Sequence, residues 1–226
     1  MIEHDDILYL QEHLPFFVKL GQEEQGRILD AALKFAYQQE ETIIYSRDTE
    51  CNGLVLVKSG RLRAFFETED GKEITLYRLL DHDICILSAS CVLKNITFTV
   101  ILEAEKDSVL FFIPAAFWGN LTSRNIHARQ FTMELVAERF SEVMWVMEQI
   151  VSKNMRQRIA VFLLEQSVLE TSATLTITHE TIAKNLGTAR EVISRILKYL
   201  ENDGIIQLSR GQIHIADLPK LKAISR

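Results

Sequence analysis

Residues 177–200 read ITHETIAKNLGTAREVISRILKYL, and the spacing of this stretch predicts two short helices joined by a tight turn. Thr178 is a candidate N-cap for the first helix, and Gly187 suits the left-handed residue that ends it. Thr188, with Glu191 three residues later, fits a capping box that opens the second helix. Such a pair of helices predicts a helix-turn-helix unit.

The second helix of this pair is predicted to have two contrasting faces. Its apolar face repeats at helical spacing and comprises Ile193, Ile196, Leu197 and Leu200. Its polar face lies roughly 200° away and comprises Glu191, Ser194, Arg195 and Lys198. In the DNA major groove arginine pairs with guanine and glutamate with cytosine, so this helix is a candidate DNA reader. An ordinary amphipathic helix pair with a solvated charged face is the alternative interpretation of the same pattern.

Two short alternating segments follow the second helix and predict a β-hairpin. Residues 205–208 and 212–215 flank the turn Ser209-Arg210-Gly211, in which the glycine favours chain reversal. A helix-turn-helix followed by such a hairpin predicts a winged-helix domain. Arg210, at the tip of the wing, is then within reach of a DNA phosphate.

This C-terminal pattern resembles the bacterial Crp/Fnr transcription regulators. The matching residues are Leu175, Ile182, Ala183, Gly187, Arg190, Glu191, Ser194, Arg195, Leu197, Leu200, Gly204, Ile205 and Ile206. The resemblance implies that Arg190, Glu191 and Arg195 read base edges of a TGTGA-type half-site, and that Ser194 reads bases as in the Fnr branch. We expect phosphate contacts at Thr178, His179, Lys198 and Arg210. Family members often have Ser where this chain has Ala189, and Thr188 is expected to supply the missing cap.

The charge of the chain is divided unevenly. All 226 residues together carry a formal net charge of −6, which is unusual for a DNA-binding protein. From Ser152 onward, however, 11 lysines and arginines stand against 7 aspartates and glutamates, a balance of +4. The preceding residues hold 14 against 24, a balance of −10. A basic C-terminal module therefore follows an acidic one, which favours DNA as the partner of the C-terminal module.

Length and composition predict two domains and a cytoplasmic protein. A chain of 226 residues with 47% hydrophobic content can bury two cores. No run approaches about 18 uncharged apolar residues, and the N-terminus is acidic, so neither a membrane span nor a signal peptide is expected. Three cysteines, an odd number, fit a reducing compartment.

The first half of the chain changes from a helical to an alternating pattern. Residues 8–34 read as helical, with a helix expected over residues 22–33. Six β-branched or aromatic runs then predict strands, at residues 41–45, 54–58, 61–66, 73–79, 98–103 and 108–113. Ser59-Gly60 and Asp70-Gly71 are hairpin signals between neighbouring runs. The pattern predicts an antiparallel sandwich or barrel. The resemblance implies a cyclic-nucleotide-binding-like β-roll (jelly-roll), and hence an α+β fold overall.

A long helix is predicted from about Asn125. Apolar side chains step by four and three residues along it and form a candidate dimer seam of Val136, Phe140, Val143, Met147 and Ile150. Packing of this helix on its own barrel is the alternative, but apolar residues on its further sides favour a parallel dimer helix that also contacts the barrel. A homodimer would hold two recognition helices about 34 Å apart on a pseudo-palindromic DNA operator.

The apolar rhythm of this helix stops at Ser152, Lys153 and Asn154, which we interpret as a hinge. The expected domains are a β-roll sensor over residues 1–124, a dimerisation helix with hinge over residues 125–154, and a winged-helix domain over residues 155–226. The resemblance implies that the effector shifts the population between two dimer arrangements through this hinge. RNA polymerase is an expected further partner.

The resemblance also identifies four effector-pocket candidates, which are Ile86, Leu87, Thr97 and Phe98. Members that bind cyclic nucleotides carry Gly-Glu at the first pair and Arg-Ser at the second, where arginine neutralises the phosphate and a carboxylate binds the ribose. All four residues are replaced here. Because a buried anion without a cation is strongly disfavoured, cyclic AMP is not expected as the effector. The pocket is either collapsed or filled by an uncharged ligand.

The cysteines suggest a second kind of sensor. No cysteine precedes Cys51, so the N-terminal iron–sulfur cluster of Fnr is not expected. Cys85 and Cys91 are candidate redox thiols, and haem ligation together with His82 is a related alternative. Packing as two small buried side chains is the simpler interpretation, because no lysine or arginine lies nearby in sequence before Lys94.

The sequence contains no recognisable catalytic or metal-binding constellation. Its six histidines are scattered, and no paired carboxylates stand out. We therefore expect a regulator rather than an enzyme. The competing functions are a thiol or haem enzyme built on this scaffold and a winged-helix domain used only for protein contacts.

Overall fold

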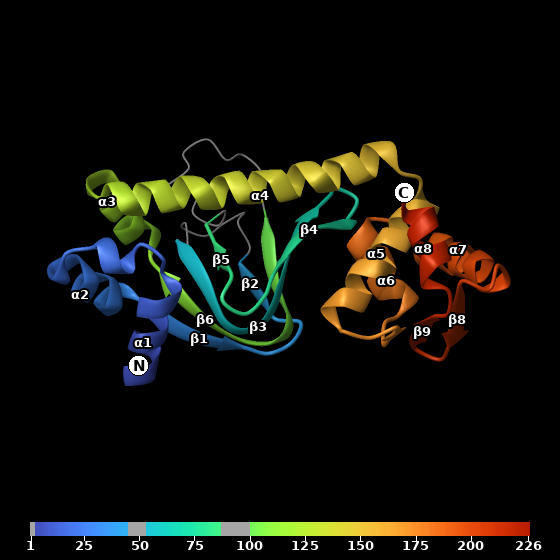
Figure 1. Cartoon of the computed structure of the whole chain (residues 1–226), viewed down its shortest axis with the longest axis horizontal. Helices are drawn as coiled ribbons and strands as arrows, with labels where there is room; N and C mark the ends of the chain where they lie inside the picture. Colours follow the sequence, from blue (N-terminus) through green and yellow to red (C-terminus); the bar gives the residue numbers. More distant parts are fainter. Residues whose placement is uncertain (1–2, 45–52, 87–99) are drawn as a thin grey trace. The chain divides into compact units, whose positions relative to one another are not determined.

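The computed structural model describes residues 3–44, 53–86 and 100–226 of the chain (Figure 1). The chain forms two compact units, the first comprising Met1–Glu67 and Leu76–Val143 and the second comprising Thr68–Thr75 and Met144–Arg226. Each unit buries apolar side chains of its own. In the described ranges, no helix is both long and apolar enough to cross a bilayer.

The first unit begins with helices α1 (His4–His13) and α2 (Gln22–Ala31), separated by the short 3-10 helix η1 (Phe17–Lys19). Their apolar residues share a core with α3 (Ala115–Arg124), whose Trp118 is fully buried. The helix predicted over residues 22–33 ends at Ala31, since strand β1 (Leu33–Tyr37) follows directly. Strand β1 pairs with a distant strand from Leu33↔Phe112 to Tyr37↔Ser108, and this pairing outweighs the local helical pattern.

Among the described residues, the sheet of the first unit has six strands. They are β1, β2 (Thr42–Ile44), β3 (Leu54–Glu67), β4 (Glu73–Leu79), β5 (Ile84–Cys85) and β6 (Ile101–Ile113). The main order is β1-β6-β3-β4, while β2 also pairs with β6 and β5 with β3. The pairings of β1, β2 and β3 with β6 are antiparallel, which agrees with the predicted β-roll and α+β fold.

Strand β3 differs from the prediction at Ser59 and Gly60. The sequence predicts a hairpin turn there, but β3 continues through both residues as one strand paired with β6. The register shifts on either side of Ser59, and Gly60 has a φ of +112°, so these residues form a bulge. A Cβ at Gly60 would lie 2.6 Å from the Asp107 carbonyl oxygen, which only glycine avoids. Asp70-Gly71, by contrast, lies in a turn as predicted.

The long helix predicted from about Asn125 is present as α4 (Ile126–Ser152). It is followed by α5 (Met155–Leu169), and the chain between them is the non-helical pair Lys153 and Asn154. Asn154 caps α5, because its Oδ1 accepts a hydrogen bond from Gln157 N at 3.1 Å. The helical break therefore falls within the predicted hinge segment.

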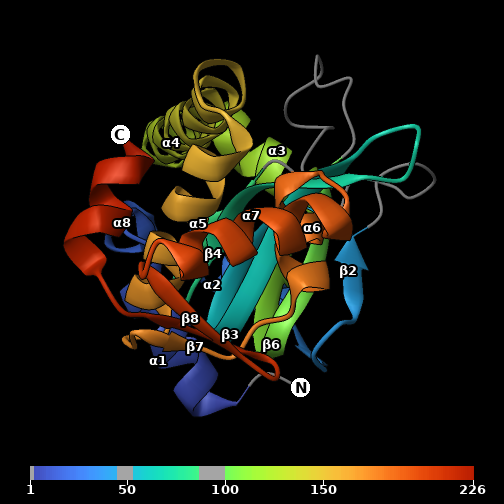
Figure 2. The same cartoon turned by 90° about the vertical axis from the view of Figure 1, so that its right-hand side faces the viewer.

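The second unit contains the predicted winged helix (Figure 2). Its helix pair is α6 (His179–Leu186) and α7 (Arg190–Asn202), and its wing strands are β8 (Ile206–Ser209) and β9 (Gln212–Ile215). Two elements were not expected from the sequence, namely strand β7 (Thr174–Leu175), which pairs with β9, and helix α8 (Leu218–Ser225). Figure 2 shows the β8–β9 hairpin projecting from the helices of this unit.

Candidate nucleic-acid interface

Helix α6 and the turn after it are built as the sequence predicts. Thr178 is the N-cap of α6, and its Oγ1 accepts a hydrogen bond from Thr181 N at 3.0 Å. Gly187 has a φ of +64° at the end of the helix, and Thr188 N donates to Ala183 O at 3.1 Å. This left-handed residue turns the chain within three residues and directs it into α7.

The start of α7 differs from the prediction. The sequence assigns the N-cap to Thr188, but Ala189 occupies that position and offers no side-chain hydrogen bond. Val192 N and Ile193 N both donate to Ala189 O, so the first turn begins one residue later than a capping box from Thr188 requires. The first N–H groups of α7 therefore lack a side-chain cap and are able to bind an anion such as a DNA phosphate.

The two faces predicted for α7 are both present. Ile193, Leu197 and Leu200 are fully buried in the core of the second unit. The exposed residues on the other side are Arg190, Glu191, Arg195 and Lys198, with Ser194 half-buried beside them. Lys198 forms an ion pair with Glu201 at 2.6 Å, whereas no ion pair within the described part of the chain uses Arg190, Glu191 or Arg195. These three charges are available to a ligand.

The wing is joined to α7 through Glu201. Its carboxylate accepts a hydrogen bond from Leu208 N at 3.0 Å and another from Lys198 Nζ at 2.6 Å. The bond from Lys198, and secondly the bond from Leu208, lower the pKa of Glu201. Arg210 is exposed at the tip of the wing, next to Gly211 with a φ of +73°. The wing therefore presents a cation from an element anchored to the recognition helix.

A side-chain contact links α6 to α7 on the side of the predicted DNA contacts. His179 Nδ1 lies 2.8 Å from Ser194 Oγ, and Ser194 Oγ donates to Arg190 O at 2.9 Å. Burial, and secondly the positive charge of Arg190, lower the pKa of His179 below its ordinary value. The sequence indicated a phosphate contact for His179 and a base contact for Ser194, but gave no sign that the two side chains touch.

Helix α4 leaves a stripe of large apolar side chains exposed. Among the predicted seam residues, Val136 and Val143 pack against cores of the first unit, whereas Phe140 is 65% and Met147 52% exposed. Ile150 is 39% exposed. The stripe that repeats by four and three residues on the exposed side comprises Met133, Ala137, Phe140, Met144, Met147 and Val151. We call these six residues the α4 stripe.

The effector-pocket candidates are described only in part. Ile86 is fully buried in a core of the first unit, whereas Leu87, Thr97, Phe98 and Cys91 lie outside the described residues. Cys85 is 1% exposed, and its Sγ lies 3.5 Å from the hydroxyl of Tyr77.

A cation that the sequence did not place near Cys85 comes from α4. The Arg139 guanidinium lies over the Tyr77 ring at 5.0 Å from its centroid, and Arg139 Nη2 donates to Ile84 O at 3.2 Å. Arg139 is 3% exposed and forms an ion pair with Glu142 at 2.6 Å. A buried guanidinium, a phenol and a thiol therefore share one cluster, which we call the Cys85 cluster.

His82 does not belong to the Cys85 cluster. Its ring stacks on His13 with 4.3 Å between centroids, and its Nδ1 lies 2.8 Å from the Tyr9 hydroxyl. His82 and Cys85 thus contact different groups. Within residues 3–44, 53–86 and 100–226, no group of three or more His, Cys, Asp or Glu is arranged to hold a metal ion.

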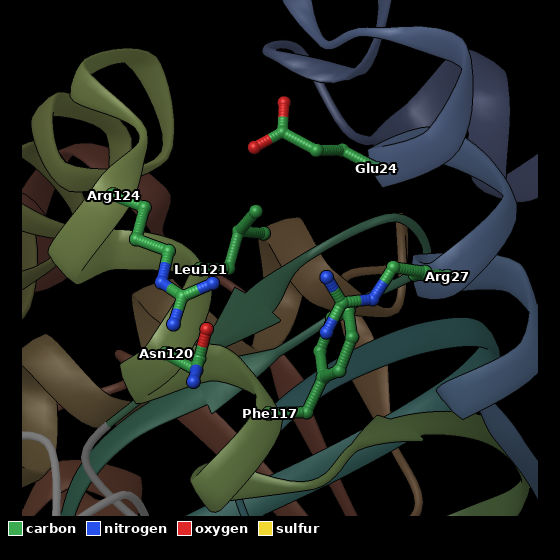
Figure 3. Close-up of a pocket in the computed structure, with 6 residues that line it drawn as sticks. All are labelled: Glu24, Arg27, Phe117, Asn120, Leu121 and Arg124. Carbon is green, nitrogen blue, oxygen red and sulfur yellow. The ribbon is translucent and has the colours of Figure 1, made fainter.

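Figure 3 shows a small pocket between α2 and α3 of the first unit. Its volume is about 30 Å³, and it is lined by Glu24, Arg27, Phe117, Asn120, Leu121 and Arg124. The guanidinium groups of Arg27 and Arg124 point toward it from the two helices. Pockets for organic ligands hold roughly 300–1,000 Å³, so this one does not accommodate a nucleotide-sized effector.

Two protein-family models match separate parts of the chain. The cyclic nucleotide-binding domain matches residues 35–125, and the Crp-like helix-turn-helix domain matches residues 157–224. The first match covers most of the sheet and α3, and the second covers α6, α7 and the wing.

Similar proteins align with nearly the whole chain. The cyclic AMP receptor protein of Thermus thermophilus is 28% identical over 220 residues, which cover 93% of this chain and 96% of that protein. The anaerobic regulatory protein of Pasteurella multocida is 24% identical over 83% of this chain and 70% of its own length. A crystal structure of a Crp/Fnr-family transcriptional regulator from Eubacterium rectale is 42% identical, with a TM-score of 0.91 over 95% of this chain and 99% of that one.

Proposed function

This chain belongs to the Crp/Fnr family of transcription regulators, and we propose that it acts as a homodimer that binds a two-fold-symmetric DNA operator under the control of its β-roll. The observation that carries this proposal is the polar face of α7. Three of its charged side chains have no ion pair within the described part of the chain, while Ile193, Leu197 and Leu200 on its opposite face are fully buried. A helix held in this way suits entry into the major groove.

We assign each polar residue of the interface one role. Base reading falls to Arg190, Glu191, Ser194 and Arg195, and phosphate binding to Thr178, His179, Lys198 and Arg210. Arginine can pair with two acceptors of guanine at once, and glutamate can accept from cytosine, so the first turn of α7 carries most of the discrimination. The positive balance of the residues after Ser152 supplies the attraction to phosphate that is independent of sequence.

The α4 stripe is the proposed contact between two copies. Phe140, Met147 and Val151 are 65%, 52% and 81% exposed, and such a row of large apolar side chains on a monomer marks an interaction surface. Steps of four and three residues match a parallel coiled-coil seam. A two-fold pairing here brings two α7 helices to two half-sites, as a pseudo-palindromic operator requires.

The β-roll over residues 1–124 is the proposed sensor, and residues 152–154 are the proposed hinge between the dimer helix (125–154) and the reader (155–226). Ile86 supports an effector other than cyclic AMP, since its apolar side chain is buried where nucleotide-binding members carry a polar segment. An apolar or uncharged effector fits this position better than a cyclic phosphate.

A second candidate sensor is the thiol of Cys85. The observation that favours it is Arg139, whose buried guanidinium shares a cluster with Cys85 and Tyr77. In this alternative, oxidation of the thiol changes the packing of α4 on the β-roll.

Selection from a randomised duplex library tests the proposed function. We expect the protein to enrich a two-fold-symmetric site, to bind it with an affinity that falls steeply as salt rises, and to lose base discrimination in Arg190→Ala. Equal binding of all duplexes by the parent protein and by Arg190→Ala would remove the base-reading role of α7.

The two sensor candidates are separated by repeating the DNA titration under three conditions. The selected duplex is titrated with the protein alone, with cyclic AMP and with hydrogen peroxide. An effect of cyclic AMP contradicts the uncharged effector. An effect of peroxide that disappears in Cys85→Ser supports the thiol sensor, whereas the same effect in Cys85→Ser contradicts it.

A further inference from the structure

The contact between His179 and Ser194 joins the two helices of the DNA reader where both approach the predicted DNA surface. His179 is the first residue of α6, and Ser194 lies on α7 one turn after Arg190. Their atoms Nδ1 and Oγ are 2.8 Å apart, and both residues are half-buried. A base-reading hydroxyl is therefore already hydrogen-bonded before DNA arrives.

The hydrogens of this contact can be assigned from the groups involved. The carbonyl oxygen of Arg190 only accepts, so Ser194 Oγ must donate its single hydrogen to it across 2.9 Å. The hydrogen between Ser194 and His179 then has to come from Nδ1 of the imidazole. Both bonds form together only when Nδ1 is protonated and Ser194 Oγ is the acceptor.

The charge state of His179 agrees with this assignment. Burial and the charge of Arg190 lower its pKa, so the ring is neutral at pH 7 and carries its one hydrogen on Nδ1. Ser194 Oγ keeps one free lone pair and has no hydrogen left to donate. A serine without such a neighbour would be able to donate or accept and would discriminate weakly.

We propose that His179 is a positioning residue for base reading, because it holds Ser194 as a hydrogen-bond acceptor toward the DNA. An acceptor in the major groove selects the amino groups of adenine and cytosine and disfavours the keto oxygens of guanine and thymine. This inference rests on the proposed function, since it specifies how one residue of α7 reads its base. For His179, this role replaces the phosphate contact assigned to it under the proposed function.

The central experiment compares base preference in five proteins, which are the parent, Ser194→Ala, His179→Ala, His179→Asn and the double variant His179→Ala/Ser194→Ala. The preference is measured at the base pair where Ser194→Ala has none. His179→Ala should lower the preference for an amino-bearing base there by about 3- to 10-fold, the worth of one hydrogen bond. His179→Asn should restore most of it, since the asparagine amide nitrogen can donate from nearly the position of Nδ1. Adding His179→Ala to Ser194→Ala should change the preference no further.

Two results would overturn the inference. One is a uniform loss of affinity in His179→Ala for all four bases, which is the signature of a phosphate contact. The other is a change in base preference on adding His179→Ala to Ser194→Ala that is as large as the change His179→Ala causes in the parent protein. In both cases the parent protein still selects a duplex, so only the inference about His179 fails. A parent protein that selects no duplex at all would instead contradict the proposed function.

A measurement without DNA tests the same assignment directly. Nitrogen-15 NMR of the full chain near neutral pH should show His179 with a protonated Nδ1 and a bare Nε2. His179→Ala serves to assign the resonance, and its thermal melt shows whether that variant is folded. A His179 ring protonated on Nε2 instead would contradict the inference, whatever the DNA data show.

Discussion

Helices α4 and α7 are both amphipathic, but their apolar faces have opposite surroundings. Leu197 and Leu200 of α7 are fully buried in their own unit, whereas Phe140 and Val151 of α4 are 65% and 81% exposed. A buried apolar face fixes the helix and leaves its polar face to act, while an exposed apolar face requires a partner. Burial therefore shows which face of each helix is available to a partner, the polar face in α7 and the apolar face in α4. Hydrophobic periodicity alone does not distinguish the two cases.

Charging the α4 stripe is expected to have the largest effect. In Phe140→Glu/Met147→Glu, carboxylates of two copies would face one another, so the dimer should dissociate to monomers in analytical ultracentrifugation. Affinity for a symmetric operator should fall by about 10²- to 10⁴-fold, since the two half-sites are no longer bound by linked readers. The fold should survive, because both residues are exposed.

Ser141→Glu is the matched control for this change. It adds a carboxylate at an exposed position on α4 outside the stripe, and it should leave the dimer intact. If the doubly charged variant still sediments as a dimer, another surface joins the two copies. The exposed apolar face of α4 would then not be the dimer contact.

A cavity in the buried face of α7 should have the next largest effect. Leu197 is fully buried, so Leu197→Ala should destabilise the second unit by about 2–5 kcal/mol, through lost burial and the cavity left behind. Hydrogen exchange of the α7 amides in the full chain measures this loss. Tyr199→Ala, at a position that is 56% exposed on the same helix, should change stability by no more than about 0.5 kcal/mol. Equal effects of the two variants would mean that α7 is not held by its apolar face.

Two substitutions on the polar face of α7 should separate specific from general DNA contacts. Arg195→Ala should cost about 1–3 kcal/mol on the selected site and relax the preference at one base pair. Lys198→Ala should weaken binding to all duplexes alike and reduce the salt slope by about 1. If Arg195→Ala also weakens all duplexes alike, Arg195 binds phosphate rather than a base.

The winged helix could be predicted because its signals are local. Thr178, Gly187 and the apolar repeat of α7 each act within one or two helical turns, and the structure places all of them as expected. The exception is the N-cap of α7. A capping box at Thr188 and Glu191 is a sequence match, but the turn geometry moves the cap to Ala189.

What the sequence did not reveal depends on contacts between distant residues. Gly60 reads as a turn, yet the long ladder with β6 keeps β3 continuous and makes it a bulge. Arg139 reaches Tyr77, the neighbour of Cys85, only because α4 packs on the β-roll. His179 meets Ser194 only because the turn brings α6 onto α7. The last of these contacts can be sought in any helix-turn-helix, since the start of the first helix faces the first turns of the second.

The smallest expected effect is a pH dependence that comes from His179. Burial and Arg190 hold its pKa below the ordinary value of 6.5 in the folded chain, so the unfolded chain takes up a proton more readily. Above the unfolded pKa neither state is protonated, and the second unit keeps its full stability. As pH falls through 6.5 toward the lower folded pKa, protonation favours the unfolded chain and stability declines.

Hydrogen exchange of α7 between about pH 7.5 and pH 5.5, corrected for intrinsic exchange rates, measures this decline in the parent and in His179→Asn. The asparagine does not titrate, and the other five histidines are common to both proteins, so the difference belongs to His179. The parent should lose more stability on acidification. Equal losses would mean that His179 is as well solvated in the folded chain as in the unfolded one. Burial and Arg190 would then not lower the pKa of His179, whereas its hydrogen bond to Ser194 would still rest on the geometry of the two side chains.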